Sequence, residues 1–196
     1  MKAQLIIIDD FYSDPDDVVS WAKTLEFTRG NGNHPGWRTL QVTENIGVKN
    51  YIQNLIRPFG GEITMWDWHP NGTFSKTNVS DINWVHSDCH NTWAGVVYLT
   101  KDAPLNSGTS IFKHKPTGLI SSPRLENGEL NEELLTTIHK DGQDKTKWEP
   151  IEVTSNVYNR LVMYRGDLFH TATNYFGSDY ENDCRFFQTF FFNTEF

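Results

Sequence analysis

The feature that most constrains the fold is an aromatic segment late in the sequence, Cys184–Phe192. Its run of phenylalanines is typical of a buried β-strand. Because alternate side chains of a strand point to the same face, Arg185, Phe187 and Thr189 share one face of this segment. A buried arginine needs a carboxylate partner or a ligand. The segment therefore predicts a β-fold that holds a charged group in its interior.

Short strand patterns separated by turns occur along the whole chain. We expect extended segments at residues 1–9, 62–68, 73–79, 84–88, 93–100, 160–165, 168–170 and 184–192. Helices are expected from about residue 14, where Asp14 caps and Pro15 follows, from about Gly47 to Pro58, and over Glu129–Lys140. This order predicts a mainly β sandwich or barrel with flanking α-helices.

The length of 196 residues favours a single domain with one core. We expect residues 1–59 to form an N-terminal strand with supporting helices, and residues 60–196 to form the β core. Residues 115–150 are expected as an insertion between core strands that helps to shape a substrate entrance. The Gly/Asn-rich loop 28–37 is a candidate lid. For both segments the alternative is an ordinary surface connection.

The short sequence His86-Ser87-Asp88 is the strongest indication of chemistry. If it lies in a strand, His86 and Asp88 point to the same side and can bind one metal ion. His170 is a third candidate ligand from a later extended segment. Two imidazoles and one carboxylate are the set that holds non-haem Fe(II) while leaving positions open. Each residue alone also fits an ordinary core or turn role, so the combination carries the prediction.

Several segments match a known family of enzymes. They are His86–Asp88, Trp93–Leu99, Ser107–Phe112, Arg160–His170 and Cys184–Phe186, together with Ile8–Pro15 and Pro35–Arg38. In these segments the chain resembles the Fe(II)/2-oxoglutarate-dependent oxygenases, especially the prolyl-hydroxylase-like branch and its small uncharacterised bacterial and phage members. The resemblance covers most of the chain, with a catalytic core at residues 60–196. It implies a double-stranded β-helix, which is a jelly-roll, cupin-like fold.

The resemblance implies a dioxygenase that couples oxidative decarboxylation of 2-oxoglutarate by O2 to hydroxylation of a substrate. The Fe(II) ligands and catalytic residues would be His86, Asp88 and His170. Halogenating relatives lack the carboxylate, so Asp88 favours hydroxylation. The substrate, whether an amino-acid or protein side chain or a small molecule, stays open, because one fold serves many substrates.

The resemblance also implies residues for the co-substrate. Arg185 would pair with the distal carboxylate of 2-oxoglutarate, and Thr189, on the same strand face, would add a hydroxyl group. Tyr98 is a further candidate contact, although a shift of one residue would turn it to the other face. The interval from His170 to Arg185 is longer than in many relatives, and Arg165 is the alternative partner.

Two other classes of protein fit the same residues. A cupin-type metalloenzyme that does not use 2-oxoglutarate would keep the metal ligands and have no need of Arg185. A non-catalytic jelly-roll module with a binding or structural role would take up no stoichiometric iron. The complete ligand set argues against the module, and the buried arginine argues against the cupin-type enzyme.

The composition disfavours some classes of binding partner and some cellular locations. The net charge of −8 disfavours nonspecific binding to nucleic acid. The apolar run within residues 1–9 is too short for a signal peptide or membrane span, and two cysteines make no disulfide framework. A cytoplasmic protein without a membrane partner is therefore expected, with no indication of its oligomeric state. We assign the remaining histidines to solvated loops (His90, His114) and to surface or packing positions (His34, His69, His139).

Overall fold

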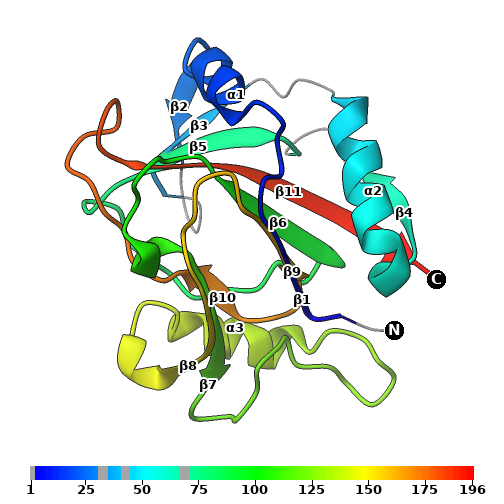
Figure 1. The fold of residues 1–196 in the computed structure, drawn as a ribbon. Coiled ribbons are helices and arrows are strands. Elements are labelled where there is room, and N and C mark those ends of the chain that lie inside the picture. The colour runs from blue at the N-terminus through cyan, green and yellow to red at the C-terminus, as the bar shows by residue number, and fades with distance from the viewer. Residues whose placement is uncertain (1–2, 31–34, 41–44, 67–70) are drawn as a thin grey trace.

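A computed structural model describes residues 3–30, 35–40, 45–66 and 71–196. Its centre is an antiparallel eight-stranded sheet with the order β1-β9-β6-β11-β5-β3-β2, in which β4 also pairs with β11 (Figure 1). The strands are β1 (Leu5–Ile8), β2 (Phe27–Arg29), β3 (Trp37–Thr39), β4 (Glu62–Trp66), β5 (Thr73–Thr77), β6 (Trp93–Tyr98), β9 (Leu161–Arg165) and β11 (Arg185–Glu195). The aromatic segment is thus the longest strand and lies inside the sheet, as its composition predicts.

A smaller sheet has the order β10-β7-β8 and consists of β10 (His170–Ala172), β7 (Thr109–His114) and β8 (Trp148–Thr154). Ile111 of β7 packs with Val96 and Tyr98 of the larger sheet, so apolar side chains fill the space between the two sheets. The result is the mainly β jelly-roll, or double-stranded β-helix, expected for this sequence. No helix in the described ranges has the length and apolarity needed to cross a membrane.

The helices are α1 (Pro15–Ala22), α2 (Ile46–Gly60) and α3 (Glu132–Lys140), with short 3-10 turns at Leu105–Ser107 and Lys145–Lys147. The cap expected at Asp14 is confirmed, because its side chain accepts a hydrogen bond from the Asp17 amide. Helix α3 begins three residues later than expected. The Asn131 side chain accepts from the Leu134 amide at 3.1 Å and thereby fixes the start of α3.

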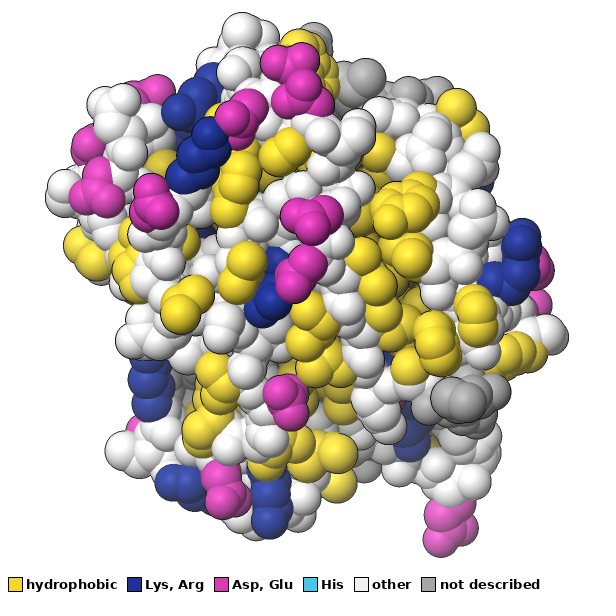
Figure 2. Space-filling model, in the orientation of Figure 1, with side chains coloured by type: hydrophobic (Ala, Val, Ile, Leu, Met, Phe, Trp, Pro, Cys, Tyr) yellow, Lys and Arg dark blue, Asp and Glu magenta, His cyan; other side chains and the backbone are white. Residues whose placement is uncertain are grey.

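Helices α1 and α2 cover one face of the larger sheet. Ala22 of α1 and Ile52 and Ile56 of α2 pack in one buried cluster with aromatic side chains of β6 and β11 such as Trp93 and Phe190. Figure 2 shows that hydrophobic side chains also gather at the surface beside α2, with charged side chains around them. The helices therefore cover one face of the larger sheet, and its opposite face packs toward the smaller sheet.

The alternation along β11 separates these two environments. Phe186, Phe190 and Phe192 belong to the helix-side core, whereas Arg185 and Thr189 line a pocket on the other face. The neighbouring strands follow the same register, since Arg185 pairs with Thr77, and Thr189 pairs with Thr73 and Val96. A polar pocket floor is thus built into an otherwise aromatic sheet.

The expected strand over residues 84–88 is wrong. The backbone there forms only an isolated bridge, between His86 and His170. The Val85 amide donates to the Gly142 carbonyl and the Asp88 amide to the Gly166 carbonyl, so these groups bond to loops instead of a neighbouring strand. Strands β2, β3, β7 and β8 were not anticipated, and β8 begins within the segment that was assigned to the insertion.

Candidate metal centre

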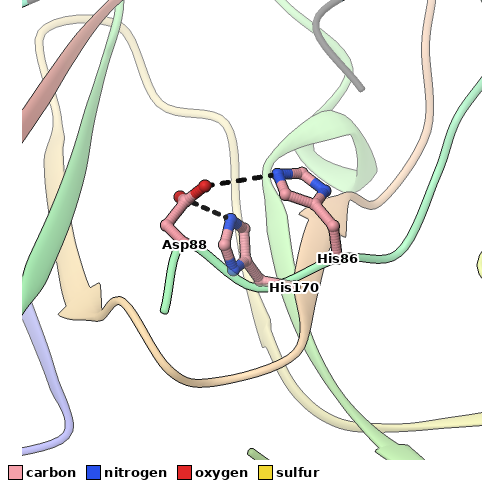
Figure 3. Close-up of side chains that lie close together, drawn as sticks. All are labelled: His86, Asp88 and His170. Carbon is pink, nitrogen blue, oxygen red and sulfur yellow. Dashed lines mark ion pairs between the residues drawn. The ribbon is translucent and has the colours of Figure 1, made fainter. Parts of the chain in front are cut away.

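Three predicted side chains, His86, Asp88 and His170, converge beside β10 of the smaller sheet (Figure 3). The Nε2 atom of His170 lies 3.2 Å from one carboxylate oxygen of Asp88, and the Nε2 atom of His86 lies 3.7 Å from the other. One potential ligand atom from each residue lies within 4.8 Å of the other two. An octahedral ion with bonds of about 2.1 Å spaces adjacent ligands about 3 Å apart, so small side-chain adjustments bring these atoms to coordinating distance.

Both imidazoles are held in the orientation that a metal requires. The Nδ1 atom of His86 lies 2.9 Å from the carbonyl of Trp84, and the Nδ1 atom of His170 lies 2.9 Å from the carbonyl of Leu168. Because a carbonyl can only accept, each Nδ1 carries a proton, and the Nε2 atom beside Asp88 is the one that a metal would take. In both residues the ring is therefore held by the carbonyl two positions earlier in the chain, and the same nitrogen, Nε2, is directed to the metal position.

The loop that carries Asp88 is fixed by a close backbone approach. The Asp88 amide donates to the Gly166 carbonyl at 2.7 Å, and the Asn91 amide donates to the Asp88 carbonyl at 2.8 Å. A Cβ atom on Gly166 would lie 2.3 Å from the Asn91 carbonyl oxygen. Position 166 therefore has to be glycine for the Asp88 loop to sit against the end of β9.

The segment between β7 and β8 supports this loop from behind. Leu135 and Ile138 of α3 form a buried cluster with Val85 and Phe169, the neighbours of two candidate ligands. The Trp84 indole donates to the His139 carbonyl of the same helix. None of the pocket-lining residues falls within 115–150. The expectation that this segment shapes the entrance is therefore replaced by a supporting role behind the ligands.

The three residues open onto a pocket whose floor is Arg185. This side chain is 3% exposed, and its Nε donates to the Ser107 carbonyl at 3.0 Å. No carboxylate in the described part of the chain forms an ion pair with it, and its carbon Cζ lies 4.3 Å from the centre of the Phe187 ring. Beside it the buried hydroxyl oxygen of Thr77 has no hydrogen-bond partner in the part of the chain that the structure describes. A buried cation next to an unsatisfied hydroxyl is an environment that a ligand carboxylate fits.

The other candidates for the co-substrate occupy different positions. Thr189 lines the pocket, and Tyr98 lies on the same face of the sheet but behind the lining, where its hydroxyl donates to Thr109 at 2.8 Å. Arg165 lies on the opposite face, with its Cζ 5.2 Å from the Trp93 ring. Of the two arginines considered, Arg185 is the one in the pocket.

Three titratable pocket residues were missed by sequence reasoning. The Tyr164 ring packs 4.4 Å from that of His170, and burial, reinforced by the charge of Asp88, holds the pKa of its phenol well above the ordinary value. Burial also raises the pKa of Tyr175 to about 12. Arg38 of β3 is the third. Alternation in the predicted strand 160–165 could have grouped Tyr164 with Val162, but no pattern in the sequence indicated Tyr175 or Arg38.

The other histidines that the structure describes lie outside the pocket. His90 is exposed as expected, whereas the expectation for His114 is wrong. His114 is buried on β7, where its ring lies 3.1 Å from Asp141 and packs against Trp148. His34 and His69 lie outside the described residues.

The fold is similar to that of solved prolyl 4-hydroxylases. A prolyl-4-hydroxylase of Pseudomonas putida aligns over 98% of this chain and 94% of its own, with 9% identity and a TM-score of 0.53. One from Phytophthora capsici aligns over 96% and 58%, with 7% identity and a TM-score of 0.51. No curated protein matches the sequence. A family model described as a family of unknown function, DUF6445, matches residues 1–185, and the chain therefore belongs to this family.

Proposed function

We propose that this protein is a non-haem Fe(II) dioxygenase that couples oxidative decarboxylation of 2-oxoglutarate to hydroxylation of a substrate. The observation that carries the proposal is the buried Arg185, without a carboxylate partner in the described chain, in the pocket onto which His86, Asp88 and His170 open. A metal site alone fits many enzymes. The added unpaired cation selects a co-substrate with a free carboxylate.

In this proposal His86, Asp88 and His170 bind Fe(II), which supplies the activation of O2. Their Nδ1–carbonyl hydrogen bonds orient the imidazoles with Nε2 toward the metal position, and the Gly166 contact holds the carboxylate in place. Arg185 pairs with the distal carboxylate of 2-oxoglutarate, and the hydroxyl groups of Thr77 and Thr189 contribute polar contacts. The aromatic side chains around Arg185 exclude water from the reacting groups.

The jelly-roll fold, which the chain shares with prolyl 4-hydroxylases, supports this function. Because these neighbours are prolyl 4-hydroxylases, an amino-acid or protein side chain is favoured as the substrate of this chain over an unrelated small molecule. The placement among small bacterial or phage members of the superfamily, and a single domain spanning 1–196 with its core at 60–196, are parts of the same proposal.

The test is an anaerobic absorption titration with Fe(II) followed by 2-oxoglutarate. We expect a weak metal-to-ligand charge-transfer band that requires both additions and needs more 2-oxoglutarate in Arg185→Gln. Arg165→Gln is the matched control and should behave as the wild type, because its guanidinium lies on the other face of the sheet. Iron binding without the band would favour a cupin-type metalloenzyme. Absence of iron binding would favour a non-catalytic jelly-roll module.

A further inference from the structure

A second arginine, Arg38, lines the same pocket. It lies on β3, where it pairs with Ser75 of β5, and Ser75 in turn pairs with Phe187 of β11. This register places Arg38 on the face of the sheet that carries Phe187, Thr189 and Arg185. Two strand spacings and two residues of offset separate the α-carbons of Arg38 and Arg185 by about 12 Å.

Arg38 is half-buried and has no hydrogen bond or ion pair within the described chain. Burial lowers the pKa of its guanidinium, and the negative charge of Asp88 opposes that effect. Asp88 is the carboxylate that the proposed metal would take. The neighbouring Ser75 hydroxyl oxygen is buried and has no hydrogen-bond partner among the described residues. An unpaired cation beside an unsatisfied hydroxyl indicates an anion that is absent from the protein itself.

The charges that line the pocket also indicate a bound anion. Among the described residues, its lining holds one acidic residue, Asp88, and two arginines. In the proposed function a divalent metal, Asp88 and Arg185 are together neutralised by the two carboxylates of 2-oxoglutarate. The single positive charge of Arg38 is then left over, in a protein whose net charge is −8.

We propose that Arg38 binds the anionic group of the substrate, so that the substrate is a carboxylate or a similarly charged monoanion. This inference rests on the proposed function. The side chains of Trp84, Tyr175 and Phe191 also line the pocket and offer apolar contacts for the carbon skeleton of such a substrate. Arg38 then fixes the distance between the charged group and the metal, which selects the carbon atom that reacts.

The test uses trifluoroacetate as the anionic probe and trifluoroacetamide as its neutral control, each followed by ¹⁹F line broadening. The full chain is measured metal-free, and again with Mn(II) and saturating 2-oxoglutarate. We expect the anion to bind more tightly than the amide in both states. Arg38→Gln should weaken the anion roughly tenfold, as expected for loss of a charge-assisted contact, and Arg38→Lys should restore part of it. Arg57→Gln, which removes a surface ion pair with Glu62, should change nothing.

Three results would overturn the inference: equal binding of anion and amide, binding unchanged in Arg38→Gln, or loss of the Arg38-dependent binding when 2-oxoglutarate is added. The last result would assign Arg38 to the co-substrate. The metal-free measurement separates the two proposals. If the protein binds neither Mn(II) nor 2-oxoglutarate but anion binding still depends on Arg38, the proposed function fails and the anion site stands.

Discussion

Replacing Arg185 by methionine should remove the stabilisation that 2-oxoglutarate gives, while leaving the protein without 2-oxoglutarate at least as stable. The guanidinium is 3% exposed and lacks a carboxylate partner in the described chain, so its charge is poorly compensated. Methionine is of similar length and apolar, and it fits against the Tyr98 and Phe187 rings, whose centres lie 5.3 and 4.3 Å from the arginine Cζ. The substitution exchanges a buried charge for apolar contact.

The magnitude follows from opposing contributions to the free energy of unfolding. Removing an uncompensated buried charge stabilises by about 2–3 kcal/mol. Losing the charged donor to the Ser107 carbonyl and the ring contacts costs about 2 kcal/mol. That carbonyl keeps a second donor, the Asn156 amide, at 3.4 Å. We therefore expect a change between zero and about 1 kcal/mol of added stability without 2-oxoglutarate. At a hundredfold excess over its dissociation constant, 2-oxoglutarate should stabilise the wild type by about 2.7 kcal/mol.

The assay is urea unfolding of the Mn(II)-loaded proteins, with and without 2-oxoglutarate. A gain of about 2.7 kcal/mol moves the wild-type midpoint by roughly 1 M. Arg165→Met is the control and should gain as much as the wild type. A loss of more than about 2 kcal/mol in Arg185→Met without 2-oxoglutarate would show that the protein already compensates the charge. An equal gain in Arg185→Met and wild type would mean that the co-substrate does not pair with Arg185.

Four other substitutions test the rest of the site. Asp88→Ala should abolish succinate formation, measured by mass spectrometry, and normal turnover would remove Asp88 from the ligand set. Gly166→Ala places a Cβ atom 2.3 Å from the Asn91 carbonyl oxygen and should displace the Asp88 loop. The affinity for Mn(II), measured by calorimetry, should therefore fall roughly tenfold. An unchanged affinity would refute this prediction. Thr189→Val should weaken 2-oxoglutarate binding. Tyr98→Phe removes a hydrogen bond behind the pocket, so it should lower the free energy of unfolding by about 1 kcal/mol with little effect on 2-oxoglutarate binding. The reverse pattern would place Tyr98 in the pocket.

Much of the local structure was predictable because it depends on neighbours in the sequence. The aromatic alternation of β11 separated Arg185 and Thr189 from the phenylalanines that pack under the helices. The cap at Asp14 depends on one side chain and an amide three residues away. His86 and Asp88 are two residues apart, and they lie together even though the predicted strand is reduced to one bridge.

The predictions failed where backbone groups bond to distant loops. The extended geometry at 84–88 was expected, but the partners of Val85 and Asp88 are carbonyl groups of Gly142 and Gly166, more than fifty residues away in the chain. The role of residues 115–150 was misplaced for a similar reason. A helix was predicted there, and only its packing on Val85 and Phe169 shows which side of the site it supports.

The sequence by itself determined the β-rich fold class, the pairing of two candidate ligands on one short segment, and the burial of an arginine in an aromatic strand. Periodicity sorts side chains into two faces because it is local. Periodicity does not say which face of the sheet meets the second sheet. That arrangement decides that Arg185, and not Arg165, lies in the pocket. Only the tertiary structure brought His170 to His86 and Arg38 to the same pocket, because strand pairing across the sheet joins segments whose separation in sequence carries no information about their distance in space.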